Sequence, residues 1–308
     1  MLQAKIFLNL FYFFDLTGAI FKRLNKIAAY ALLLKVLHVL QINMDIKLEI
    51  LSIEWLEAYL QQVPAGLQAA FDALHDAEIS THTFSFYTSV SAIASSRIEG
   101  EAMEIDSFVK HKMLNIEYQP ELVKKPDDLY DAYLFAQQNS LTKAHFLKAH
   151  CILATHLLPE NKQGICRTGN MVVMEHNTGK IQFEAAPANQ VPDLFDTLWR
   201  DIETLKNVPL TMEQVFYFAS FIHLVFVNVH PFEDGNGRAG RLLEKWFIAE
   251  KTGEKAWFMQ TELYYYTHVN DYYRNLNRLG IFYEQLDYAK SMFFLLMLPD
   301  AVIGMGDK

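Results

Sequence analysis

Apolar residues recur every three or four positions along most of this sequence, which is the spacing of one face of an α-helix. Residues 127–138, for example, would bury Leu129 and Tyr133 on one face, and Pro159 would end the helix that follows. The pattern predicts helices over residues 51–62, 66–76, 83–98, 127–138, 141–158, 192–205, 212–228, 238–250, 262–279 and 283–298.

One stretch of the chain departs from this helical period. Residues 171–174 (MVVM) and 181–183 (IQF) are short apolar runs on either side of the turn-forming sequence 176–179 (HNTG), a pattern typical of a β-hairpin. The predicted fold is therefore all-α, a helical bundle that carries one small β-hairpin.

The composition narrows the class of protein. With 308 residues and 51% hydrophobic content the chain can bury a sizeable core, and its many aromatic residues disfavour disorder. A net charge of −9 disfavours nonspecific nucleic-acid binding, so nucleic acid is not an expected partner. The two cysteines, Cys151 and Cys166, have no metal or redox spacing and are compatible with a reducing cytoplasm, where we expect the protein to reside.

The first 44 residues differ in charge from the remainder. They contain five Lys and Arg residues against one acid, Asp15, and their two apolar runs, 6–14 and 27–34, are shorter than the roughly 20 residues that span a bilayer. Three interpretations stay open: a start at Met44, a helical extension packed on the domain, or a membrane-surface or export segment.

Chemistry-bearing residues concentrate in residues 230–241, HPFEDGNGRAGR. His230 can be a neutral base near pH 7, because the ordinary pKa of histidine is about 6.5. Asp234 offers a hard oxygen ligand of the kind that Mg²⁺ shares with substrate phosphates. We assign no role to Glu233.

The second half of this segment has the features of an anion site. Gly235 and Gly237 lack a Cβ, so backbone amides can surround anionic oxygens, and Asn236 tolerates the left-handed conformation that such a loop needs. Arg238 and Arg241 lie three residues apart and would share one face of a following helix as a pair of phosphate ligands.

A competing interpretation is a dinucleotide fold. Gly235, Gly237 and Gly240 also satisfy G-x-G-x-x-G, with Glu262 in the place of a ribose-binding acid. That motif requires a preceding strand, whereas residues 215–229 form a long apolar run opened by Thr211 and Gln214, which are spaced as a capping box. The sequence therefore favours a helix here.

Residues 230–241 resemble the Fic family signature, HxFx[DE]GNGRxxR, at every specified position. Most members of that family transfer AMP from ATP to a hydroxyl side chain of a target protein. The resemblance implies a catalytic base at His230, Mg²⁺ bound by Asp234, and nucleotide phosphates bound by Gly235, Asn236, Gly237, Arg238 and Arg241. It also implies ATP and a target protein, which can be this protein itself, as partners. Together with the charge pattern, it predicts a domain order of an extension (1–43), an N-terminal helical region with the inhibitory helix (44–120), a Fic core (121–300) and a tail (301–308).

Three further segments resemble parts of the same family. Residues 95–100 (SSRIEG) are similar to an inhibitory motif, [ST]xxxE[GN], whose glutamate pairs with the second signature arginine; here these are Glu99 and Arg241, with Ser95 and Gly100 completing the motif. The hairpin resembles the flap over the active site, which implies target docking by Arg167, Thr168, Val172, Val173 and Met174. Residues 272–276 resemble the helix of the adenine pocket, with Tyr272, Tyr273 and Leu276, although Gly280 stands where the family often has asparagine.

Other activities stay open at this point. Relatives that transfer phosphate have lysine at the position of Gly237, so the glycine favours AMP transfer. Removal of AMP from a modified target, with Glu99 aligning water, is a second enzymatic alternative. A catalytically silent helical interaction module is a third, and it predicts the loss of a catalytic residue that this chain retains.

Overall fold

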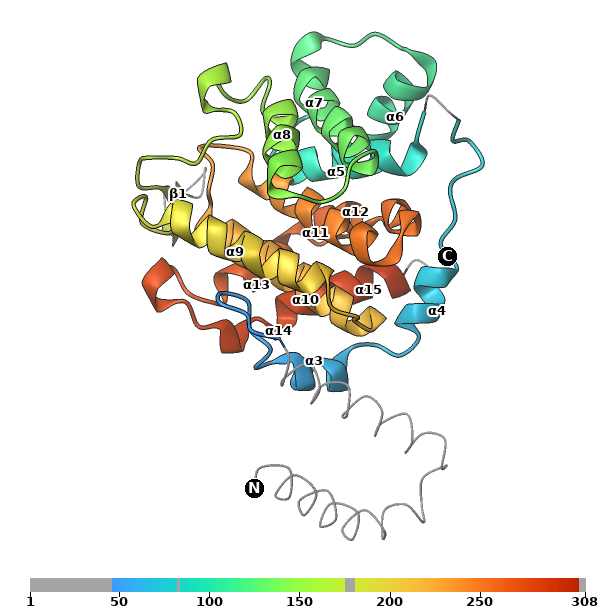
Figure 1. Ribbon diagram of the computed structural model, residues 1–308. Coiled ribbons are helices and arrows are strands. Elements are labelled where there is room, and N and C mark those ends of the chain that lie inside the picture. The colour runs from blue at the N-terminus through green and yellow to red at the C-terminus, as the bar shows by residue number, and fades with distance from the viewer. Residues whose placement is uncertain (1–45, 82–83, 175–180, 305–308) are drawn as a thin grey trace, which may run out of the picture. The chain divides into compact units, whose positions relative to one another are not determined.

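The structure, a computed structural model, describes residues 46–81, 84–174 and 181–304 (Figure 1). The fold described below is that of the compact unit Leu48–Lys308. The predicted extension 1–43 and the predicted turn 176–179 lie outside the described residues.

Two long helices form the centre of the fold. Helix α10 (Met212–Val229) begins with a capping box of Thr211 and Gln214, and α11 (Asn236–Thr252) packs against it. By length and composition α10 could cross a membrane, but 94% of it is buried inside the protein, as expected of a core helix. At Gly240 a Cβ would lie 3.0 Å from Val227, so the glycine permits close contact between these helices. Helix α9 (Val191–Lys206) packs on α10 from the side (Figure 1).

A second layer contains α5 (Phe86–Ile98), which packs on α7 (Pro120–Gln137) and α12 (Thr261–Thr267), while α7 packs on α8 (Lys143–Leu153). Nearly every residue of α5 from Thr88 onward is buried, so this helix belongs to the core. The other described helices are α3 (Leu56–Gln62), α4 (Leu67–Asp72), α6 (Ile105–Leu114), α13 (Val269–Asn277), α14 (Met292–Leu295) and α15 (Met297–Ile303), with short 3-10 turns η1 (Glu160–Lys162), η2 (Glu254–Phe258), η3 (Tyr283–Gln285) and η4 (Tyr288–Lys290).

A buried ion pair fastens α5 to its neighbours. Lys245 of α11 donates to Glu262 of α12 at 2.5 Å and to the Ser91 hydroxyl of α5 at 2.7 Å. Tyr133 of α7 donates to the other oxygen of Glu262 at 2.6 Å. Because both charges in this cluster have hydrogen-bond partners, the cost of burying them is offset. The cluster thereby links the four helices α5, α7, α11 and α12.

The predicted hairpin is present. Strands β1 (Val172–Met174) and β2 (Ile181–Glu184) are antiparallel, with Val173 opposite Phe183. On its other side, Glu184 makes a parallel bridge to Phe282.

The all-α prediction is confirmed, but several predicted boundaries are wrong. Helix α6 was not predicted, because only Phe108 and Val109 of its residues are buried and the apolar period is correspondingly weak. Helix α7 begins at Pro120 and carries Pro126 inside it. The helix predicted over 262–279 breaks at His268 into α12 and α13. The helix predicted over 283–298 is replaced by η3, η4, α14 and α15.

Candidate active site

The segment 230–241 forms a turn between the two central helices. Helix α10 ends at Val229 and is capped by His230, which takes the left-handed conformation (φ 53°), and Gly235 takes it again (φ 80°) immediately before α11. At Gly235 a Cβ would lie 2.9 Å from Leu153. The left-handed position expected at Asn236 is therefore at Gly235, and the prediction for Asn236 is wrong because that residue opens helix α11.

Asn236 and His150 hold this turn in shape. The Asn236 amide accepts from the backbone N–H of Phe232 at 2.9 Å and donates to its carbonyl at 2.8 Å. His150 of α8 stacks on the Phe232 ring at 3.6 Å, donates from Nε2 to the Asp234 carbonyl at 3.0 Å, and accepts at Nδ1 from Gly164. Burial lowers the pKa of His150 to about 4, so it is neutral at pH 7.

The tautomer of His230 is fixed by the backbone. Its Nδ1 lies 3.0 Å from the Val227 carbonyl, which can only accept, so the proton is on Nδ1 and Nε2 is left as a base. Burial lowers the pKa of His230 to about 4, outweighing the Val227 bond. The ring of Phe183 in the flap meets the histidine edge-on at 5.5 Å between centroids. His230 is thus neutral, is oriented by the backbone, and is covered on one side by Phe183 of the hairpin.

Every nitrogen of the Arg241 guanidinium has a protein partner. Its guanidinium, 1% exposed, donates to the Ser95 hydroxyl at 2.8 Å, to the Ser95 carbonyl at 3.0 Å and to Glu99 at 2.7 Å. Its Nη1 lies 3.3 Å from the hydroxyl of Tyr272. Burial alone would raise the pKa of Glu99, but Arg241 and Arg238 overcome this and hold it below its ordinary value. Glu99 is therefore a carboxylate at neutral pH.

The Glu99 carboxylate occupies the space above Gly237. A Cβ at Gly237 would lie 2.2 Å from Oε1 of Glu99. Gly237 is in the first turn of α11, where backbone N–H groups have no partner within the helix and attract anions. In this structure the protein's own carboxylate therefore lies beside the anion-binding end of α11.

A chain of buried hydrogen bonds holds Tyr272, the aromatic partner of Arg241, in place. The Tyr272 hydroxyl lies 3.0 Å from His223 Nε2, and Nδ1 of the same histidine lies 2.8 Å from Glu244. Tyr265 donates to both oxygens of Glu244 at 3.0 and 3.1 Å. These groups lie on α10, α11, α12 and α13, so the position of Arg241 depends on the packing of four helices.

Arg238 differs from Arg241 in having free donors. It is only 5% exposed, yet its Nε and Nη1 have no hydrogen-bond partner in the described chain. Asp234 and Glu101 lie 3.8 Å away, near enough for charge attraction but too far for hydrogen bonds. Buried, unbonded guanidinium donors are costly without a ligand, and an anionic oxygen is the partner that they fit.

Asp234 fits a shared magnesium site. Its side chain is 51% exposed at the mouth of the turn, and Oδ1 accepts from Gly235 at 2.6 Å, which leaves Oδ2 available. No group of three or more acidic, histidine or cysteine residues with metal-site geometry occurs among the described residues. One carboxylate together with substrate phosphates and water is a usual Mg²⁺ environment, so the donor set suits Mg²⁺ held jointly with a nucleotide.

A cavity of about 370 Å³ brings many of the predicted residues together, although Asp234 and Arg238 do not line it. Its lining includes the predicted base, a glycine and an arginine of α11, the predicted inhibitory acid, two hairpin residues and the α13 residues of the predicted adenine pocket: His230, Gly237, Arg241, Glu99, Val173, Met174, Tyr272, Tyr273 and Leu276. Asn277 and Gly280 also line it. Tyr273 donates to the Ile98 carbonyl at 3.1 Å, which ties α13 to the end of α5.

The flap residues fall into two groups. Val172 and Met174 are exposed, at 43% and 57%, and Thr168 is exposed as well. Arg167 is 2% exposed and donates to backbone carbonyls, including that of His230 at 2.7 Å and that of Ala186 at 2.5 Å. Its guanidinium thus caps the end of α10 and holds the start of the hairpin in place. Because the side chain is buried, it cannot contact a target protein as the resemblance implied.

Comparison with known proteins agrees with this geometry. Residues 140–248 match the Fic/DOC family. This segment is therefore similar to Fic/DOC domains. Members of the family typically transfer nucleotide-derived groups. The matched residues contain the whole turn 230–241, whereas Glu99 and Tyr272 lie outside them. No curated protein matches the chain.

Solved Fic structures share the fold. A Fic family protein from Desulfovibrio desulfuricans G20 is 23% identical with a TM-score of 0.59, and the match covers 72% of this chain and 65% of that one. This chain thus spans slightly less than two thirds of the length of that relative. A Fic-domain signaling protein from Bacteroides thetaiotaomicron is 17% identical (TM-score 0.54; 82% of this chain, 92% of that one). Fic-1 from C. elegans with a glutamate-to-glycine substitution is 16% identical (TM-score 0.55; 82% and 71%).

No sequence pattern indicated a role for His150, for the His223–Glu244 pair or for the Lys245–Glu262 pair. His150 and Asp234 are 84 residues apart, and neither histidine belongs to a recognisable motif. Only the helix packing reveals that His150 and His223 support the site.

Proposed function

We propose that this protein transfers AMP from ATP to a hydroxyl side chain of a target protein, and that Glu99 restrains the reaction. The observation that carries the proposal is His230: a neutral imidazole with Nε2 available, in the same cavity as Gly237 and Arg241. A neutral base beside an anion-binding helix end suits attack of a hydroxyl on phosphorus.

The residues would divide the reaction as follows. The target hydroxyl attacks the α-phosphorus of ATP, its proton passes to Nε2 of His230, and pyrophosphate leaves. The N-terminal amides of α11 and Arg238 bind phosphate oxygens, and Arg241 does so once Glu99 has moved. Asp234 would hold Mg²⁺, which neutralises phosphate charge when bound. The exposed edge of the flap, with Val172 and Met174, can align a target segment by main-chain bonds.

Inhibition by Glu99 follows from competition for Arg241. Carboxylate and phosphate both bind a guanidinium, and Glu99 already holds it at 2.7 Å. Helix α5 is a core element, so release requires movement of the Glu99 side chain, which is 27% exposed, rather than departure of the helix.

Two related activities are separable from this one. Phosphate transfer is disfavoured because relatives with that activity have a lysine at the position of Gly237, and this chain has no side chain there. Removal of AMP from a target would use Glu99 to align water, and would therefore require the residue that restrains AMP transfer.

Labelled ATP distinguishes these reactions. Wild-type protein and Glu99→Gly are incubated with Mg²⁺, a cell lysate and ATP labelled at either the α- or the γ-phosphorus. We expect protein labelling from α-labelled ATP, stronger with Glu99→Gly. Labelling only from γ-labelled ATP would establish phosphate transfer, and no labelling from either would overturn the proposal. Loss of α-label from pre-modified target with wild type, but not with Glu99→Gly, would identify AMP removal.

A further inference from the structure

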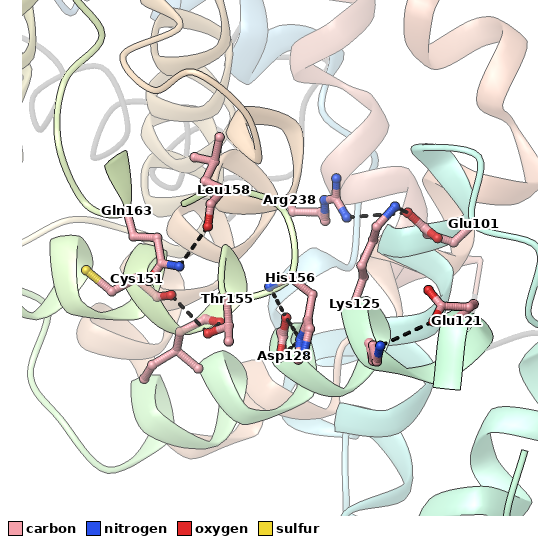
Figure 2. A network of polar contacts seen from close by, with 12 residues as sticks. Glu101, Glu121, Lys125, Asp128, Cys151, Thr155, His156, Leu158, Gln163 and Arg238 are labelled. Atoms are coloured by element: carbon pink, nitrogen blue, oxygen red, sulfur yellow. Dashed lines mark hydrogen bonds and ion pairs between the residues drawn. The ribbon is translucent and has the colours of Figure 1, made fainter. Parts of the chain in front are cut away.

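A second acid lies beside the phosphate site. The sequence 99–101 is Glu-Gly-Glu, and the two glutamates face different arginines of α11: Glu99 bonds Arg241, and Glu101 lies 3.8 Å from Nη1 of Arg238. Figure 2 shows Glu101 beside both Arg238 and Lys125 of α7. Both cations approach the same carboxylate oxygen, and Lys125 donates to it at 2.8 Å.

The position of Glu101 is set by the backbone. After α5 the N–H of Gly100 bonds the Arg97 carbonyl at 3.0 Å, and that of Glu101 bonds the Ser96 carbonyl at 3.1 Å. This is the Schellman arrangement, with Gly100 in the left-handed conformation at φ 89°. The side chain is then held by Lys125 and is 15% exposed. Glu101 is therefore placed by a rigid helix end and a fixed partner.

The contact with Arg238 differs in kind from that between Glu99 and Arg241. At 3.8 Å the Glu101 carboxylate compensates the charge of Arg238 without using its hydrogen bonds, and Nε and Nη1 stay unbonded. A phosphate oxygen bound to Nη1 would stand within a few ångströms of that carboxylate. Two like charges this close in a buried site repel, so the carboxylate opposes phosphate binding while leaving the guanidinium in position.

We propose that Glu101, held by Lys125, is a second restraining carboxylate that weakens binding of the terminal phosphates of a nucleotide at Arg238. The inference rests on the proposed function, in that the anion at Arg238 is the polyphosphate of ATP. Glu99 blocks one arginine by direct bonding, and Glu101 lowers the phosphate affinity of the other by repulsion. Lys125 moderates this repulsion by sharing the charge of Glu101.

The test is calorimetric titration of full-length protein in the Glu99→Gly background, in which Arg241 is free. Glu101→Gln should tighten ATP binding about tenfold, which is about 1.4 kcal/mol. Tripolyphosphate should respond as ATP does. AMP, which lacks the terminal phosphates, should change by less than about threefold. Lys125→Met should act in the opposite direction and weaken ATP binding, because the carboxylate then has no second partner.

Neighbouring residues provide matched controls (Figure 2). Glu121 and Lys124 form an exposed pair at 3.2 Å on the same helix as Lys125, so Glu121→Gln and Lys124→Met change the net charge equally and should leave affinity unchanged. Glu101→Asp, which shortens the side chain, should give a smaller gain than Glu101→Gln and serves if the latter does not fold.

The outcomes separate this inference from the proposed function. If a folded Glu101→Gln protein binds ATP no more tightly than its background, or AMP gains as much as ATP, the inference is overturned. If the control variants give the same gain, the effect is one of net charge and the inference is again overturned. If ATP and tripolyphosphate bind as expected but no α-label reaches protein, the proposed transfer fails and Glu101 still restrains an ATP site. Absence of any anion binding overturns both.

Discussion

Arg238 and Arg241 lie three residues apart on one helix, yet their side chains differ in hydrogen bonding. Arg241 donates hydrogen bonds to Ser95 and Glu99 and lies against the hydroxyl of Tyr272, whereas Arg238 is buried with two nitrogens unbonded. Arg241 must release a protein partner before it can bind phosphate. Arg238 has unbonded donors for a ligand but lies 3.8 Å from the carboxylates of Asp234 and Glu101. One site therefore combines a closed end and an open end, which we call the Arg241 end and the Arg238 end.

The largest expected effect tests whether both ends serve one reaction. In the Glu99→Gly background, His230→Ala should reduce transfer about a thousandfold, because general base catalysis contributes about 10² to 10⁴ in rate. ATP affinity should change little, since the imidazole acts on the nucleophile and the arginines bind phosphate. The measurement pairs α-label transfer with calorimetry. Near-normal transfer by the alanine variant would refute the assigned base, and a large loss of affinity would show that binding and catalysis are not separate.

A second effect concerns the support of the Arg238 end by neutral His150. Its pKa of about 4 in the fold lies below the ordinary 6.5, so its contribution to stability is complete above pH 6.5 and is lost as the pH falls through about 4. The difference corresponds to about 3 kcal/mol. Urea denaturation from pH 7 to pH 4 should show this loss, and His150→Gln should reduce the pH dependence.

His230 titrates in the same range, because its pKa is also about 4. The informative quantity is therefore the difference between wild type and His150→Gln at each pH, with His230→Ala as a parallel reference. If the wild type and His150→Gln lose stability in parallel as the pH falls, His150 is not the group that titrates.

How far the sequence predicts this molecule depends on the distance between interacting residues. His230, Asp234, Gly237 and the two arginines lie within twelve residues, so one local pattern was enough to find them. The helical period likewise predicted α5, α9 and α10 with small boundary errors, because each has a long apolar stripe or is buried throughout.

Contacts between distant segments were accessible only in part. The pairing of Glu99 with Arg241 across 142 positions was expected only from family resemblance, since no periodicity links α5 to α11. The roles of His150 and Arg167, and the ion pair between Glu101 and Lys125, could be seen only in the folded structure. The regions after Pro120 and after Tyr283 were misread because proline and aromatic residues there fit more than one local structure.

The third prediction addresses the Arg241 end directly. Glu99→Gly should raise α-label transfer about a hundredfold, because misalignment of a reacting group by about 1 Å costs roughly that factor. Removing the carboxylate leaves Arg241 with Ser95 and Tyr272 and opens the space above Gly237. Glu104→Gln, which removes an acid paired with Arg97, is the matched control and should leave transfer unchanged. Equal activity of Glu99→Gly and wild type, with both folded and binding ATP, would contradict inhibition by Glu99.

The smallest effect is expected from Asp234 at the Arg238 end, and its sign depends on the cation. Without Mg²⁺, Asp234→Ala removes a carboxylate that lies 3.8 Å from Arg238, so ATP binding should not weaken and should improve slightly. With Mg²⁺, wild-type protein gains affinity through the shared ion and the variant does not, so ATP binding by the variant should be about tenfold weaker, or about 1.4 kcal/mol. Calorimetry with and without Mg²⁺ should therefore show opposite changes in ATP affinity, whereas a variant that fails to fold would lose affinity under both conditions.

Glu233→Ala, which removes a neighbouring acid paired with Lys162, is the control and should change ATP affinity equally with and without Mg²⁺. If Asp234→Ala shows the same Mg²⁺ dependence as wild type, the ion is held elsewhere, and Asp234 serves only to balance the charge of Arg238.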